Sequence, residues 1–172
     1  MLNWPQINKS LIIMLTTLAL ASCGFHLRDD RTLPSNTDYL YVQASSQNAP
    51  LVRALENRMN VYQIKGGATA DPALKDTTIT IVLQPEKLDR RLLSVFATGQ
   101  VAEYELIYGV RYTVLFPDGG ELKTSFEVLR EYQDDPDQVL AKSRELNLVL
   151  SEMRLEAADR IIRLLSSQYR GK

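Results

Sequence analysis

The feature that most constrains the fold is a long alternation of apolar and polar residues in the middle of the chain. Within residues 101–116 every second position is apolar: Tyr104, Leu106, Tyr108, Val110, Tyr112, Val114 and Phe116. Glu103, Glu105, Arg111 and Thr113 lie between them. Alternate side chains of a strand point to the same face, so the pattern predicts a strand with one buried and one wet face. The aromatic stripe could instead bind a sugar or a nucleobase, but such regular alternation favours a sheet that packs against helices.

A turn and further strands accompany this strand. Pro117-Asp118-Gly119-Gly120 is typical of a hairpin turn, because glycine tolerates positive φ. The hairpin predicts a partner strand over 122–132 with Thr124, Phe126 and Val128 inward. Residues 39–43 and 77–83 predict two shorter strands.

Two helices complete the predicted domain. One begins at Pro50, with Leu51, Val52, Leu55 and Met59 at helical spacing. The other is predicted over 136–165, about 45 Å long. Its core stripe would be Val139, Leu146, Val149, Leu150, Met153, Ala157, Ile161 and Leu164. The order of elements predicts an α+β fold, with two helices packed on one face of a roughly four-stranded, largely antiparallel sheet.

The first residues are typical of a bacterial lipoprotein signal. Lys9 precedes an apolar run over 11–21, which is too short for a transmembrane helix and suits a secretory signal. The run ends in Leu20-Ala21-Ser22-Cys23-Gly24, which resembles a lipobox, and Cys23 is the only cysteine of the chain. We therefore expect cleavage after residue 22 and lipid attachment at Cys23. The alternative is an ordinary signal followed by a buried core cysteine. Gly24 after the cysteine favours the outer membrane over inner-membrane retention.

Composition and reactive residues exclude several classes of function. Without residues 1–22 the acidic residues outnumber the basic ones by two, which argues against nucleic-acid binding. The only histidine, His26, lies three residues after the predicted lipid. No nucleophile with a base, metal-ligand cluster or phosphate-binding glycine loop can be assembled, so we expect no enzyme activity, no metal and no cofactor besides the covalent lipid.

Basic residues suggest a binding function. Arg90 and Arg91 lie between a predicted strand and Leu92-Leu93, and Lys142 lies near the start of the last helix. Cations beside apolar groups could bind an amphiphile with anionic head groups and acyl tails. Any one exposed cation is more simply a solvated side chain.

Several short blocks together resemble the lipopolysaccharide-assembly lipoprotein family LptE. They are Cys23-Gly24-Phe25-His26-Leu27-Arg28, Leu33-Pro34, Val95-Phe96-Ala97-Thr98-Gly99-Gln100, Ala102-Glu103-Tyr104, Phe126-Glu127-Val128, Asp134-Asp135-Pro136 and Leu140-Ala141-Lys142. The resemblance implies two helices on a four-stranded sheet and a non-enzymatic role. It implies that the chain helps to assemble and plug the outer-membrane barrel LptD and binds lipopolysaccharide.

Of the two basic residues that the family uses, this chain has one. Lys142 matches a family lysine implicated in lipopolysaccharide binding, whereas Ala97 stands where the family has a second basic residue. Arg90 and Arg91 could substitute for that residue. The competing functions are an adaptor lipoprotein of another envelope complex that binds no lipid and, less favoured, a small hydrolase.

The expected organisation has four parts. Residues 1–22 are a cleaved signal, 23–38 an anchor and leader, 39–168 a single α+β domain, and 169–172 a C-terminal tail. The domain is expected on the periplasmic side of the outer membrane or in the barrel lumen.

Overall fold

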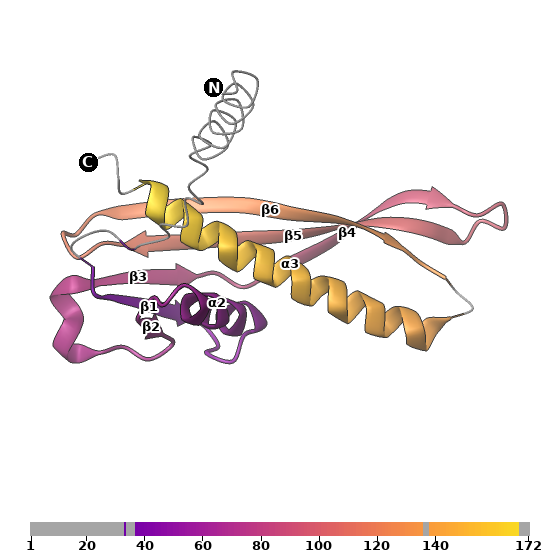
Figure 1. The fold of residues 1–172 in the computed structure, drawn as a ribbon. Coiled ribbons are helices and arrows are strands. Elements are labelled where there is room, and N and C mark those ends of the chain that lie inside the picture. Colours follow the sequence, from indigo (N-terminus) through magenta and orange to yellow (C-terminus); the bar gives the residue numbers. More distant parts are fainter. Residues whose placement is uncertain (1–32, 34–36, 136–137, 169–172) are drawn as a thin grey trace, which may run out of the picture. The chain divides into compact units, whose positions relative to one another are not determined.

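The structure is a computed structural model that describes residues 33, 37–135 and 138–168 (Figure 1). These residues belong to one compact unit, Arg31–Lys172. The signal, Cys23, His26, most of the leader, Pro136 and the tail lie outside the described residues.

The described chain contains six strands, two α-helices and one 3-10 helix. In order they are β1 (Tyr39–Ala44), α2 (Pro50–Val61), β2 (Gly66–Gly67), η1 (Pro72–Thr77), β3 (Thr78–Leu83), β4 (Lys87–Val95), β5 (Val101–Leu115), β6 (Glu121–Gln133) and α3 (Val139–Gln168). The predicted α+β class is confirmed, with more strands than expected.

The sheet is organised around the long strand β5. Its residues 103–115 pair antiparallel with β6, and its other side pairs antiparallel with β3 near Leu115 and with β4 near Val101. Strand β1 lies parallel to β3, and β2 extends the sheet beside β1. The predicted sheet lacked β2 and β4. The pair of glycines in β2 is too short to show a pattern, and β4 shows no apolar alternation because nearly all of its residues are exposed.

Both helices pack on one face of this sheet, as predicted. The predicted buried side of β5 is confirmed: Leu106, Tyr108, Val110, Tyr112 and Val114 are at most 2% exposed. Helix α2 buries Leu51, Val52, Ala54, Leu55 and Met59 against the strands.

Helix α3 is fully buried only from Met153 onward, whereas Leu146, Val149 and Leu150 are partly buried against the core. Met153, Ala157 and Ile161 belong to the core, as predicted. Val139 does not, because it is 68% exposed at the very first turn. The first turns run away from α2, toward the end of the sheet where β4 turns into β5 (Figure 1). Little of the core reaches them, so their apolar side chains stay in solvent.

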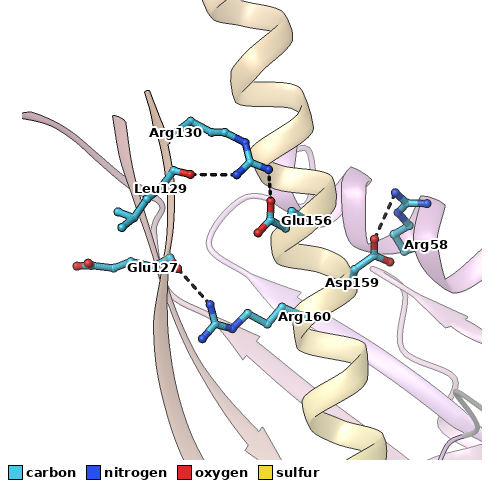
Figure 2. Close-up of polar contacts among 7 residues, drawn as sticks. All are labelled: Arg58, Glu127, Leu129, Arg130, Glu156, Asp159 and Arg160. Atoms are coloured by element: carbon cyan, nitrogen blue, oxygen red, sulfur yellow. Dashed lines mark hydrogen bonds and ion pairs between the residues drawn. The ribbon is translucent and has the colours of Figure 1, made fainter. Parts of the chain in front are cut away.

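Polar contacts fix α3 to the elements on either side of it (Figure 2). Arg160 Nη1 donates to the Glu127 carbonyl of β6 (3.2 Å), and Arg130 of β6 pairs with Glu156. On the other side Arg58 Nη2 of α2 pairs with Asp159 Oδ2 at 3.3 Å. These contacts hold α3 obliquely across the sheet, which leaves its first turns beside the far ends of β4, β5 and β6.

Glu86, in the connection between β3 and β4, joins both helices to the sheet. Its Oε1 accepts a hydrogen bond from Leu51 N in the first turn of α2 (2.9 Å). Its Oε2 lies 3.1 Å from Arg154 Nε of α3. Arg154 also lies over the ring of Tyr108, with 5.9 Å between Cζ and the ring centroid.

Candidate functional site

Two of the three predicted basic residues lie on the helix-covered side of the sheet. Arg90 pairs in register with Leu106, whose side chain is fully buried under the helices, so Arg90 projects to that same side. Lys142 reaches this region from the second turn of α3. The strand register and the oblique path of α3 therefore bring together two cations that are 52 positions apart in sequence.

Each of these cations lies over a tyrosine ring. Arg90 Cζ is 6.0 Å from the ring centroid of Tyr104, and Lys142 Nζ is 5.5 Å from that of Tyr132. Tyr104 and Tyr132 are direct cross-strand partners on β5 and β6. A cation above an aromatic face is attracted by the quadrupole of the ring, so the tyrosine pair positions both charges.

Lys142 is held further by two hydrogen bonds. The Tyr132 hydroxyl donates to the Lys142 carbonyl oxygen at 2.7 Å, which ties the start of α3 to β6. Lys142 Nζ donates to Glu145 Oε2 at 2.9 Å. The hydrogen bond to the Glu145 carboxylate raises the pKa of Lys142, so the ammonium stays charged at neutral pH. Burial, followed by the Glu145 carboxylate, raises the pKa of Tyr132.

A cavity of about 520 Å³ opens between the start of α3 and the far ends of the strands. Its lining includes Lys142 and Phe96 together with the acidic residues Glu103, Asp134, Asp135 and Glu145. These carboxylates make the interior of the cavity unfavourable for an anion.

Exposed apolar side chains gather around the same end of the fold. On the β4 side they are Leu92 (54% exposed), Leu93 (44%), Val95 (53%) and Phe96 (45%), and on α3 they are Val139 (68%), Leu140 (80%) and Leu148 (61%). A cluster of exposed apolar side chains indicates an interaction surface, because exposed side chains do not contribute to the packed core. Sequence reasoning missed Leu140 and Leu148 as part of this surface and wrongly assigned Val139 to the core.

The third predicted basic residue is separated from the other two. Arg91 pairs in register with Glu105 and forms an ion pair with its side chain on the opposite side of the sheet. Neighbours along a strand point to opposite faces, so Arg90 and Arg91 cannot serve one ligand head group together. Ala97 is exposed in the turn between β4 and β5 and contributes no charge.

Within residues 33, 37–135 and 138–168 no group of three or more His, Cys, Asp or Glu side chains could hold a metal ion. None of the helices over these same residues is long and apolar enough to cross a membrane. Two positioned cations beside apolar side chains suit an amphiphile with an anionic head group.

Comparison with known proteins agrees with this picture. The sequence model of the LptE lipopolysaccharide-assembly family matches residues 37–165. The LPS-assembly lipoprotein LptE of Photorhabdus laumondii is 33% identical over 166 residues, which cover 95% of this chain and 87% of the relative. The protein of the same name from Pectobacterium atrosepticum is 30% identical over 156 residues, which cover 91% of this chain and 83% of the relative.

Solved structures share the fold. The crystal structure of rare lipoprotein B from Shewanella oneidensis superposes with a TM-score of 0.65 at 36% identity, covering 76% of this chain and 95% of that one. The solution structure of a lipoprotein B from Nitrosomonas europaea has a TM-score of 0.66 at 24% identity, covering 86% and 94%, and supports the fold alone. The predicted family resemblance and non-enzymatic role are confirmed. The chain therefore belongs to the LptE family, and it is an envelope lipoprotein of the lipopolysaccharide-assembly system.

Proposed function

We propose that the chain binds lipopolysaccharide at the Arg90 and Lys142 end of the domain. The observation that carries the proposal is the pair of cations held over the cross-strand tyrosines Tyr104 and Tyr132. Phosphate groups of the ligand would contact the two cations, and acyl chains would cover exposed apolar side chains such as Leu92 and Leu140.

The apolar contacts would supply most of the affinity. Each methylene removed from water contributes about 0.8 kcal/mol, so five buried methylenes contribute about 4 kcal/mol. Exposed ion pairs contribute much less and are screened by salt. The cations would therefore orient the ligand, while the acyl chains would hold it.

Glu145 is expected to oppose binding. It already accepts a hydrogen bond from Lys142, so a phosphate would have to share that ammonium with a carboxylate. Removing the carboxylate charge with Glu145→Gln should free Lys142 and strengthen binding.

Displacement of a fluorescent lipopolysaccharide from residues 24–172 tests this site. We expect Arg90→Asp and Lys142→Asp to weaken binding in a salt-sensitive manner, and Glu145→Gln to strengthen it. Arg91→Asp is the matched control, since it makes the same charge change on the other side of the sheet. Full affinity in the Arg90→Asp/Lys142→Asp double variant would refute the site and favour an adaptor lipoprotein that binds no lipid.

The second part of the proposal concerns location. We propose that Cys23 carries the lipid anchor, that the anchor lies in the outer membrane, and that the domain assists assembly of the barrel LptD and plugs its lumen. Membership of the LptE family supports this role. The charged outward side of the sheet, with Glu105, Arg111 and Glu127, suits a polar barrel wall.

Co-purification tests the plug. A lumen-bound plug should survive detergent extraction in stoichiometric complex with the much larger barrel. Recovery of the chain free of any barrel, from cells that express both proteins, would contradict it.

A further inference from the structure

A groove lined by charged side chains and a glycine crosses the side of the sheet that no helix covers. Gly109 of β5 pairs in register with Lys87 on β4 and Glu127 on β6, and Arg111 pairs with Ser125 on β6. Two adjoining hollows of about 470 Å³ and 330 Å³ lie along these rungs and share Arg111 and Ser125. They form one groove across β5 and β6, on the opposite side from Arg90 and Lys142.

The floor of the groove is open because residue 109 is glycine. A Cβ at this position would meet only the carbonyl oxygen of Lys87 at 3.7 Å and its Cβ at 3.8 Å, which are ordinary contacts. The φ angle of Gly109 is also not positive. Packing and backbone conformation therefore do not require glycine here, although glycine inside a strand weakens it by roughly 0.5–1 kcal/mol relative to alanine. Close approach of a ligand or of another backbone is one of the reasons for which strands carry an interior glycine.

The groove is predominantly positive at its centre. Lys87, Arg111 and Lys123 line it, against the single carboxylate of Glu127. Lys87 and Lys123 already pair with Asp89 (2.7 Å) and Glu121 (3.1 Å). Arg111 is exposed, and its guanidinium has no hydrogen-bond or ion-pair partner within the described part of the chain.

The neighbouring side chains on β6 also face outward. Figure 2 shows the side chains of Glu127 and Leu129 pointing away from α3. Leu129 is 46% exposed beside the groove. A partner seated on this side would therefore meet a carboxylate and an apolar side chain next to the unpaired guanidinium.

We propose that this groove is the surface on which the wall of the barrel partner packs. The wall would present an extended segment with a carboxylate opposite Arg111, and its backbone would approach over Gly109. A guanidinium binds a carboxylate through two parallel hydrogen bonds, which fixes the register of such a segment. The open floor at Gly109 and the unpaired guanidinium of Arg111 suit an extended protein segment that carries a carboxylate. The inference rests on the plug function proposed above.

Two substitutions test the groove in the full lipidated chain, co-expressed with an affinity-tagged LptD barrel. Arg111→Glu places a like charge opposite the expected carboxylate, and Gly109→Tyr fills the floor with a strong strand former. Arg163→Glu is the matched control, because Arg163 is an exposed arginine of α3 without a partner among the described residues. Thermal unfolding of each purified variant shows whether the domain remains folded.

We expect both groove variants to unfold at or near the wild-type temperature and to bind the barrel at least about tenfold more weakly, which corresponds to about 1.4 kcal/mol. The control should bind as wild type. Wild-type binding by both groove variants would overturn the groove and leave the plug function standing, whereas a wild-type chain that fails to bind the barrel would overturn both. Loss of lipopolysaccharide binding in Arg111→Glu, with barrel binding intact, would overturn the groove by making it a lipid site.

Discussion

Replacing Glu86 should reveal how the domain holds its two helices together. The N-cap of α2 is Ala49, which has no side-chain capping bond, and Pro50 has no N–H to satisfy. Leu51 N is therefore capped from outside the helix by Glu86. The other carboxylate oxygen pairs with Arg154, and the two side chains of that pair are only 20% and 24% exposed. One substitution removes a helix cap and a half-buried ion pair together.

The expected cost follows from these two contacts. Loss of a helix cap costs about 1 kcal/mol, and a hydrogen bond to a charged group contributes about 1.5–3 kcal/mol. With the lower value for the partly exposed pair, Glu86→Ala should reduce the free energy of unfolding by about 2.5 kcal/mol. For a domain of this size that lowers the melting temperature by roughly 5–10 °C. Glu86→Gln retains an acceptor for Leu51 N and should lose about half as much.

Urea denaturation followed by circular dichroism measures both effects. Glu131→Ala is the control, since Glu131 is exposed and has no partner among the described residues, and it should stay within about 0.5 kcal/mol of wild type. If Glu86→Ala loses less than about 1 kcal/mol, Glu86 does not hold the helices and the account of the fold is wrong.

Three further predictions concern the anchor, the core and alkaline pH. In cells that lack the barrel, Cys23→Ser should release the protein from the membrane fraction while its circular dichroism is unchanged, because the chain has no other cysteine. Tyr112→Asp should unfold the domain, because Tyr112 is 2% exposed and an unpaired buried carboxylate costs several kcal/mol, whereas Glu131→Lys should melt as wild type. Burial raises the pKa of Tyr108 and of Tyr112 above 10, so only the unfolded chain ionises them just above that pH. The folded state then binds more protons, and stability should fall above pH 10 by up to about 1.4 kcal/mol per pH unit for each tyrosine; Tyr108→Phe should flatten the fall measured by urea denaturation.

The strands with one buried side could be predicted from the sequence, and the exposed strand could not. In β5 burial imposes an alternation, so the positions of Leu106, Tyr108 and Tyr112 follow from their spacing. In β4 nearly every residue is exposed, so burial leaves no pattern to read. The parallel pairing of β1 with β3 depends on where the chain between them crosses, which local periodicity does not encode.

The candidate site could be predicted only in part for a related reason. Lys142 and Arg90 were identified from charge and family resemblance, but the face on which a strand residue lies depends on its register. Without β4, the opposite directions of Arg90 and Arg91 could not be seen. The exposure of Val139 depends on the oblique path of α3, which is set by tertiary contacts such as Arg160 with Glu127.

Site-specific photo-cross-linking in growing cells tests the central claim that the Arg90 side of the domain binds lipopolysaccharide. Leu92 and Leu129 are matched positions, since both are exposed leucines (54% and 46%) and they lie on opposite sides of the sheet. A photoreactive residue at 92 should form adducts with lipopolysaccharide, and one at 129 should form adducts with the barrel. Lipopolysaccharide adducts at 129 but not at 92 would contradict the proposed function.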